Sequence, residues 1–274
     1  MAIHDLTTPI VGIKGAGEMA SAVAHRLFVS GIRNILLMDL PAPLAVRRRV
    51  SFSDAIYDGV ATVEGVKGER VDRPRSVVDI WERGSVAVIV DPKWRAIETF
   101  VPTVVVDAIL AKANLGSSTG EAELVIGLGP GFCAGIDVHA VIETNRGHDL
   151  GRIVEDGRAA RNTGVPGTIA GYDEKRVLRS PAPGVFFAVR DIGDILSAGD
   201  LVGTVGTTEV RAPIDGVVRG LIRSNVEVAV GIKLGDIDPR GVPQYCSTIS
   251  DKARNISGAV LQLVVRHMAG KWNP

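Results

Sequence analysis

Short apolar runs alternate with helical patterns along the first hundred residues of the chain. The apolar runs are rich in Val and Ile and cover residues 10–13, 34–38, 60–63, 86–90 and 103–106. Brief runs of this kind are typical of strands buried on both faces of a parallel sheet. Between them, apolar positions recur at helical spacing in residues 18–29, 43–57, 74–83 and 93–100. The alternation predicts a doubly wound, Rossmann-like parallel sheet domain over residues 1–122.

The first predicted strand leads directly into a glycine turn, where residues 15–20 read Gly-Ala-Gly-Glu-Met-Ala. In this setting Gly15 allows the tight turn, Gly17 lets a phosphate approach the backbone, and Ala20 permits close packing of helix on sheet. The N-terminus of the following helix offers its N–H groups to the anion. The pattern predicts a phosphate-binding turn, and the alternative is a turn that only packs a βαβ unit.

Charged residues flank this turn. Asp39 ends the second predicted strand, 22 residues after Gly17, where a carboxylate accepts hydrogen bonds from a ribose. Glu18 opposes a second anion at the turn, and Lys14 is placed to offset it. The predicted cofactor site therefore consists of Lys14, Gly15, Gly17, Glu18, Ala20 and Asp39, together with the second loop described next.

A second glycine loop lies in the segment of residues 123–175. The apolar run at residues 124–128 predicts a strand, and it leads into Gly129-Pro-Gly131. Such a turn requires unusual backbone angles. We expect Gly129 and Gly131 to contribute a second loop suited to anion binding.

Polar and apolar residues alternate over residues 136–142. In an extended conformation, Asp137, His139 and Glu143 share one face while the apolar residues share the other. Two further polar side chains follow, so the candidate substrate face consists of Asp137, His139, Glu143, Arg146 and His148. The plain alternative is a solvent-facing strand edge.

Two sharper hypotheses concern the same segment. A metal ion held by Asp137, His139 or His148 with Cys133 would match no standard ligand spacing, so no metal site is predicted. The second hypothesis is that Cys133 acts as a nucleophile, but we expect Cys133 to be a small buried thiol. No catalytic residue is assigned.

An internal repeat dominates residues 176–243. A shift of 32 residues aligns Ser180-Pro-Ala-Pro-Gly-Val185 with Ala212-Pro-Ile-Asp-Gly-Val217. Short Val/Ile runs separated by Gly and Asp predict β structure with tight turns in each half. The two halves resemble the barrel-sandwich hybrid fold of biotinyl and lipoyl domains. The joining turn, residues 206–210, has no lysine, so we expect a docking or structural module and not a carrier.

The last segment, residues 244–274, is predicted to contain a closing helix over residues 250–265 with one apolar stripe. The expected organisation is therefore a Rossmann-like domain, a glycine-loop extension, a hybrid barrel and a C-terminal helix.

Composition narrows the function classes. Lys plus Arg number 31 and Asp plus Glu also number 31, so the zero net charge gives no reason to expect nucleic-acid binding. Cys133 and Cys246, which are 113 residues apart, form no disulfide framework and favour a reducing compartment. No apolar run reaches the roughly 18 residues of a membrane helix, and the first residues do not read as a signal peptide. A cytoplasmic protein without a membrane partner is expected.

Several motifs together resemble the YqeB family, described as accessory proteins of selenium-dependent molybdenum hydroxylase systems. They are Ile-Lys-Gly-Ala-Gly (13–17), Pro-Leu-Ala-Val-Arg-Arg (43–48), Val-Ser-Phe-Ser-Asp-Ala (50–55), Ile-Gly-Leu-Gly-Pro-Gly-Phe (126–132), Val-Ile-Glu-Thr-Asn-Arg-Gly-His-Asp-Leu-Gly-Arg (141–152), Gly-Asp-Ile-Asp-Pro-Arg (235–240) and Ile-Ser-Asp-Lys-Ala-Arg (249–254). The resemblance implies a role in maturation of, or cofactor delivery to, a molybdenum hydroxylase client enzyme. It names no catalytic residue.

The resulting expectation is an accessory protein that binds a nucleotide of the NAD(P) type or a molybdenum-cofactor-like ligand. Self-association into a homo-oligomer is a further expectation. One alternative is an NAD-dependent oxidoreductase, although no Tyr-x-x-x-Lys or comparable proton donor follows the sheet. The other alternative is a non-catalytic assembly scaffold that keeps a degenerate nucleotide turn.

Overall fold

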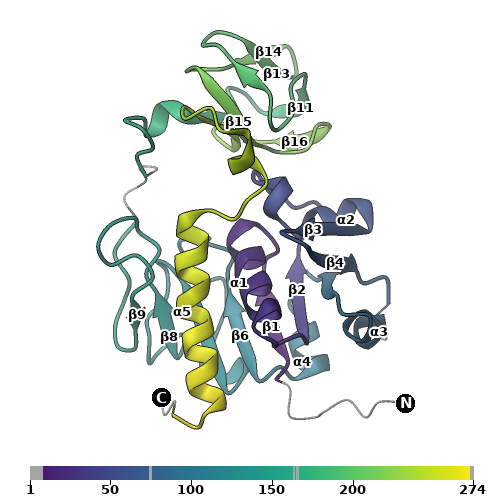
Figure 1. Cartoon of the computed structure of the whole chain (residues 1–274), viewed down its shortest axis with the longest axis vertical. Coiled ribbons are helices and arrows are strands. Elements are labelled where there is room, and N and C mark those ends of the chain that lie inside the picture. The colour runs from purple at the N-terminus through teal and green to yellow at the C-terminus, as the bar shows by residue number, and fades with distance from the viewer. Residues whose placement is uncertain (1–8, 74–75, 163, 165–166, 272–274) are drawn as a thin grey trace. The chain divides into compact units, whose positions relative to one another are not determined.

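The structure is a computed structural model that describes residues 9–73, 76–162, 164 and 167–271 (Figure 1). The chain forms two compact units. Unit 1 contains Met1–Pro43, Ser51–Asn162 and Ile249–Pro274, and unit 2 contains Leu44–Val50 and Thr163–Thr248. The ranges predicted as a glycine-loop extension and as a C-terminal helix do not stand apart in this division, because both belong mainly to unit 1.

A nine-stranded mixed sheet forms the centre of unit 1, in the order β3-β4-β5-β2-β1-β6-β7-β8-β9. Its strands are β1 (Val11–Lys14), β2 (Ile35–Asp39), β3 (Val60–Val63), β4 (Val66–Arg70), β5 (Val86–Val90), β6 (Val104–Asp107), β7 (Leu124–Leu128), β8 (Ala140–Ile142) and β9 (Ile153–Val154). The strands from β4 to β8 are parallel, whereas β3 and β9 pair antiparallel at the two edges. The central strands are almost wholly apolar, so they are buried on both faces.

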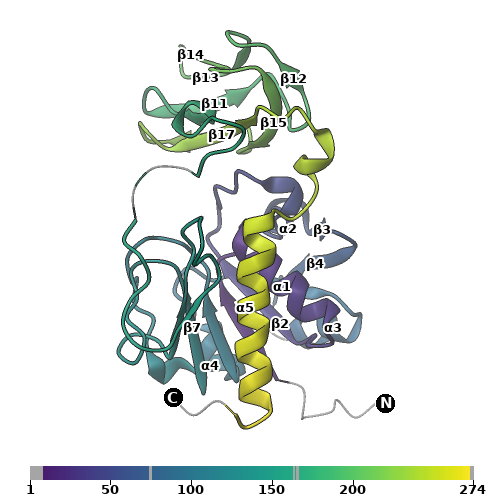
Figure 2. The same ribbon diagram turned by 60° about the vertical axis from the view of Figure 1, so that its left-hand side comes forward.

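Helices α1 (Glu18–Val29) and α5 (Asp251–Met268) lie side by side in unit 1 (Figures 1 and 2). The Ser250 side chain accepts a hydrogen bond from the Ala253 N–H and caps α5 at the residue where the sequence predicted its start. Shorter helices are α2 (Asp54–Asp58), α3 (Ser76–Glu82) and α4 (Ala96–Phe100). The predicted helix over residues 74–83 begins at Pro74, which lies outside the described residues.

Unit 2 consists of two four-stranded antiparallel sheets, β10-β17-β15-β12 and β14-β13-β11-β16. Their strands are β10 (Val177–Arg179), β11 (Gly184–Ala188), β12 (Ile195–Leu196), β13 (Leu201–Val205), β14 (Thr208–Arg211), β15 (Gly216–Leu221), β16 (Val226–Val228) and β17 (Lys233–Asp238). Two glycines that the sequence repeat aligns have similar backbone conformations. Gly184 and Gly216 begin equivalent strands with φ of +145° and +152°, values that favour glycine.

The predicted fold class, a Rossmann-like parallel sheet followed by a biotinyl/lipoyl-like hybrid barrel, was wrong. The run at residues 60–63 was assigned to the parallel sheet, but β3 turns back through Glu64 and Gly65, with φ of +43° and +85°, and pairs antiparallel with β4. Two such residues form the tight turn that a hairpin prefers. The sheet also continues through β7, β8 and β9, so it crosses the predicted boundary at residue 122.

The predicted helix over residues 43–57 also differs from the structure. Leu44–Val50 belongs to unit 2, and only a short 3-10 helix, η1 (Arg48–Val50), forms there before α2. The Arg47 guanidinium donates to the Tyr245 and Thr248 carbonyls at 2.8 and 3.1 Å, and Arg48 Nε donates to the Leu221 carbonyl at 2.7 Å. These bonds hold the segment against unit 2 and replace the helix that its apolar spacing suggested.

Candidate functional site

The glycine turn lies between the carboxyl end of β1 and the N-terminus of α1, as predicted. Gly15 has φ +90°, and its N–H donates to the Met38 carbonyl at 2.7 Å, so the chain reverses tightly beside β2. Ala20 is fully buried, consistent with the close helix packing expected there. The turn therefore has the backbone geometry that the sequence suggested.

Gly17 is the distinctive residue of this turn. Its φ of −71° is open to any amino acid, and a Cβ added to it would meet no atom within 4 Å. Neither backbone strain nor crowding therefore requires glycine at this position. Open space beside the first turn of a twelve-residue helix is where an anion can approach the backbone N–H groups.

Asp39 lies at the end of β2 and is bonded to this turn. One carboxylate oxygen accepts the Ala16 N–H at 2.8 Å, and the other accepts the Leu40 N–H at 2.8 Å. Burial raises the pKa of Asp39, and the two backbone hydrogen bonds counteract only part of that shift. Each oxygen keeps a second lone pair, so the ribose contact stays a prediction.

Lys14 is fully buried at the end of β1. Its ammonium donates to Ser117 Oγ at 2.6 Å and to Glu121 Oε1 at 2.7 Å, and it lies 4.2 Å from the centre of the Trp94 ring. Ser117 Oγ in turn donates to Asp107 Oδ2 at 2.7 Å. The positive charge of Lys14 is therefore paired with Glu121. Lys14 is not placed to offset the negative charge of Glu18, as the sequence had suggested.

Lys252, in the first turn of α5, is a charged neighbour of Glu18 that the sequence analysis missed. Burial lowers its pKa, as does Arg146, while the charges of Glu18, Glu143 and Asp251 oppose this shift. Among the described residues, its ammonium has no hydrogen-bond or ion-pair partner. No local signal could have placed Lys252 near a turn more than two hundred residues earlier, because the neighbourhood depends on packing of α5 along α1.

The second glycine loop is closely packed. Gly129 has φ +81°, and a Cβ there would lie 2.5 Å from Thr144 Oγ1. Gly131 has φ +117°, and its Cβ would lie 2.7 Å from the Ala113 backbone nitrogen. Protein atoms already fill both positions, which accounts for glycine without a ligand, so anion binding at this loop stays a prediction.

The predicted polar strand face is not one continuous strand face, because the chain is extended only in β8. Three of its residues accept backbone hydrogen bonds. Asp137 accepts the Cys133 N–H at 2.8 Å, and His139 Nδ1 accepts the Val125 N–H at 2.9 Å. Glu143, which is 5% exposed, accepts the N–H groups of Asn145 and Ala160 at 2.6 and 2.7 Å. These contacts order the loops, and a substrate role for the three residues stays a prediction.

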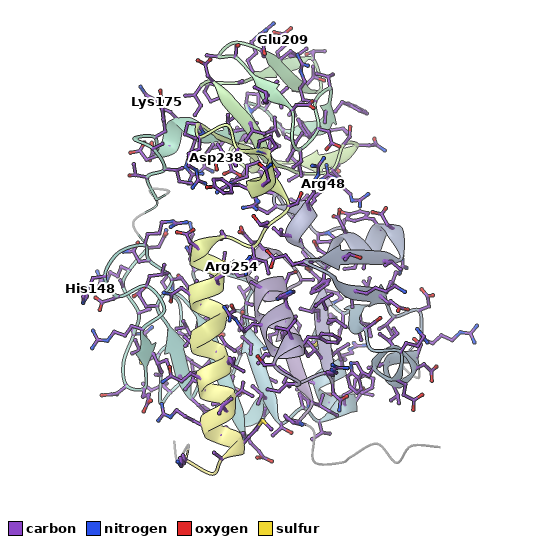
Figure 3. All side chains as sticks on the ribbon, viewed as in Figure 1. Arg48, His148, Lys175, Glu209, Asp238 and Arg254 are labelled. Atoms are coloured by element: carbon purple, nitrogen blue, oxygen red, sulfur yellow. The ribbon has the colours of Figure 1, made fainter. Side chains whose placement is uncertain are left out.

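The other two residues of that predicted face have different surroundings. Arg146 forms a two-pronged ion pair with Asp251 at 2.6 and 2.9 Å, next to Lys252. His148 is exposed at the outer edge of unit 1 (Figure 3). Within the described ranges, no group of three or more His, Cys, Asp or Glu side chains is arranged to hold a metal ion, and Cys133 and Cys246 are both buried free thiols.

The motif at residues 235–240 forms a charged network in unit 2. Asp236 Oδ2 accepts from Arg176 at 2.9 Å and from Arg219 at 2.6 Å, and Asp238 accepts two bonds from Arg240 at 2.6 and 2.9 Å. Asp236 and Asp238 are fully buried, and Figure 3 marks Asp238 within unit 2. The network links β15 to β17 and to the 3-10 helix η3 (Glu174–Arg176).

These observations define a protein of two units. Unit 1 is an α/β unit with a mixed sheet, and it has an open glycine turn at the carboxyl end of its central strand β1. The chain is 44% identical over 265 residues to the uncharacterized protein YqeB of Escherichia coli strain K12. The similarity covers 97% of this chain. The chain spans about half the length, 49%, of that relative. No protein-family model matches the chain.

The similar solved structures have low sequence identity to this chain. An aspartoacylase family protein from Mesorhizobium loti has a TM-score of 0.27 at 12% identity, with 84% of both chains covered. A succinylglutamate desuccinylase/aspartoacylase from Rhodobacter sphaeroides has a TM-score of 0.27 at 12% identity, with 84% of this chain and 85% of the other covered. The ectoine utilization protein EutE (DoeB) from Ruegeria pomeroyi has a TM-score of 0.24 at 13% identity, with 83% of this chain and 56% of the other covered. At these scores we draw no functional conclusion from the similar structures.

No helix in the described part of the chain is long and apolar enough to cross a bilayer.

Proposed function

We propose that this protein is an accessory protein for a molybdenum hydroxylase and that it holds a nucleotide or a phosphate-bearing cofactor at the glycine turn between β1 and α1. The observation that carries the ligand part is Gly17, a glycine that neither its φ nor its surroundings require. A phosphate placed there meets the N-terminus of α1, whose backbone N–H groups and dipole favour negative charge.

The charges around the turn are compatible with an anionic ligand. Glu18 disfavours an anion, and the unpaired ammonium of Lys252 compensates for it from α5. Asp39, at the end of the adjacent strand β2, has acceptor capacity left for a hydroxyl-bearing sugar. A dinucleotide and a phosphate-bearing pterin each carry a phosphate group together with a polar ring system.

The test compares ligand binding in two glycine variants. Calorimetry is performed with NAD, NADP, ATP, CTP and molybdopterin derivatives on the wild-type chain, on Gly17→Asp and on Gly258→Asp. Gly258 is the matched control, because it lies inside α5 with a negative-φ backbone and no atom within 4 Å of an added Cβ. We expect at least one ligand to bind the wild type and Gly258→Asp, and to lose at least about tenfold in affinity with Gly17→Asp. If no ligand binds the wild type, the ligand part of the proposal fails.

The client enzyme requires a separate test. The association with a molybdenum hydroxylase follows from the family resemblance, and it predicts that activity of a co-expressed hydroxylase depends on this chain. Hydroxylase subunits are purified from cells with and without the chain, and their molybdenum content and activity are compared. Equal content and activity would contradict the maturation role. Mass spectrometry of small molecules released from the denatured chain identifies a ligand retained through purification.

A further inference from the structure

A pocket of about 500 Å³ lies along α4. Its loop neighbours the strand β2 that contacts the glycine turn, because the Asp91 N–H donates to the Asp39 carbonyl at 3.0 Å. Its lining comes from one stretch of chain: Ile89, Val90, Asp91, Pro92, Lys93, Arg95, Ala96, Thr99 and Phe100. The volume is within the range of small-molecule sites, about 300–1,000 Å³. Nothing in the proposed function uses this pocket.

One wall of the pocket is apolar. Ile89 and Val90, at the end of β5, are partly exposed, although the first three residues of the same strand are buried. Phe100, from the last turn of α4, is also only partly buried. A flat apolar group placed against these side chains would remove their remaining surface from water, which is favourable in free energy.

Two cations complete the lining. Lys93 and Arg95 are exposed, and neither side chain has a hydrogen-bond or ion-pair partner among the residues that the structure describes. The one carboxylate in the lining, Asp91, accepts the Ala96 N–H at 2.8 Å and so holds the start of α4. The lining holds two cations and one carboxylate, so its net charge is positive.

The loop that carries these cations is firmly held. Trp94 lies between them with φ +54°, a conformation that bulky residues rarely adopt. The centre of its ring lies 4.2 Å from the buried ammonium of Lys14, and the backbone N–H of Trp94 donates to the Asp91 carbonyl at 3.3 Å. Trp94 therefore fixes the loop through its contact with Lys14 and does not line the pocket. The side chains on either side of it, Lys93 and Arg95, do line the pocket.

We propose that this pocket binds a small molecule in which a planar apolar ring carries an anionic group. The ring lies against Ile89, Val90 and Phe100, and the anionic group pairs with Lys93 and Arg95. The lining of this site contains no residue of the glycine turn.

Two fluorescent probes with the same ring system test the proposal. Anilinonaphthalene sulfonate carries an anionic group, and phenylnaphthylamine lacks it. We expect the sulfonate to bind the wild-type chain with at least about tenfold higher affinity than the neutral probe. The double variant Lys93→Gln/Arg95→Gln should weaken sulfonate binding about tenfold while changing binding of the neutral probe less than about twofold.

Control variants place the bound probe in this pocket. Arg158→Gln/Arg161→Gln removes two other exposed charges of unit 1, and it should leave sulfonate binding unchanged. Val90→Glu, which puts a carboxylate into the apolar wall, should weaken binding of both probes, with circular dichroism confirming that the variant is folded. Equal weakening by the two double variants, or equal affinity of the two probes, would overturn the proposal.

A final arm separates this site from the proposed function. Gly17→Asp should leave the affinity for the sulfonate unchanged, because the pocket lining does not include the glycine turn. Loss of sulfonate binding in Gly17→Asp would overturn the independence of the two sites.

Discussion

The carboxylate of Asp39 accepts a hydrogen bond from the backbone N–H of Ala16, with 2.8 Å between the two heavy atoms. The bond joins the end of β2 to the middle of the glycine turn after β1. It fixes the turn from the side of the neighbouring strand, so the position of Gly17 depends on Asp39 as well as on local backbone angles.

We expect Asp39→Ala to lower the free energy of unfolding by about 1–3 kcal/mol, since the N–H groups of Ala16 and Leu40 lose their acceptor. Asp39→Asn keeps one acceptor oxygen and should cost less. Urea denaturation followed by circular dichroism measures both variants. Equal stability of Asp39→Ala and the wild type would show that the turn does not need this bond.

Two glycine substitutions should change stability in opposite directions. Gly129→Ala brings a Cβ to 2.5 Å from Thr144 Oγ1 at φ +81°, so it should destabilise by about 1–3 kcal/mol. Gly258→Ala fills open space inside α5 and should stabilise by about 0.5–1 kcal/mol, because alanine has the higher helix propensity. Thermal unfolding measures the midpoint temperature of each variant. A change of the same sign in both midpoints would contradict the prediction that one site is crowded and the other open.

The sequence predicted elements well where the signal was local. The ranges predicted for α1, β5 and β7 match the structure, because dense apolar runs and a glycine start define them without distant partners. The segment 44–50 was misassigned because its conformation depends on bonds from Arg47 to carbonyls about two hundred residues later. The hairpin at Glu64 and Gly65 carried one local signal, the glycine at position 65, which the spacing of apolar residues does not reveal.

The candidate site was predictable only in part for the same reason. Gly15 and Gly17 occur in a recognisable order within a strand-turn-helix unit. The ion pairing of Lys14 with Glu121 and the proximity of Lys252 to Glu18 result from tertiary packing, which residue spacing does not encode. Which charged side chains lie beside the glycine turn could therefore be determined only from the folded structure.

Lys252 is expected to support anion binding at the turn. Lys252→Gln should weaken binding of the ligand identified for the wild type about three- to tenfold, because the positive charge that Lys252 places near the turn is then lost. The loss should shrink at high salt, since a partly exposed charge is screened. Titrations at two salt concentrations check this, with the exposed Lys271→Gln as control. Equal effects of the two substitutions would remove Lys252 from the site.

The charged network of unit 2 predicts acid sensitivity. Burial alone would raise the pKa of Asp236, but Lys233, Arg219, Arg176 and Arg47 outweigh it and lower the pKa below its ordinary value of 3.8. A carboxylate with a lowered pKa stabilises the folded state above the unfolded pKa, and this contribution disappears as pH falls through the folded value. Stability of unit 2 should therefore decline below about pH 4.

Hydrogen–deuterium exchange of peptides from β15 and β17 measures this decline locally. In the wild type, protection should fall as the pH is lowered from about 5 to about 2, after correction for the intrinsic exchange rate. Asp236→Asn should lower protection at neutral pH by about 1.5–3 kcal/mol, because charged hydrogen bonds are lost, and should flatten the pH dependence. Glu227→Gln, at an exposed position of β16, is the control and should keep the wild-type profile. A steep acid loss that persists in Asp236→Asn would assign the sensitivity to another carboxylate.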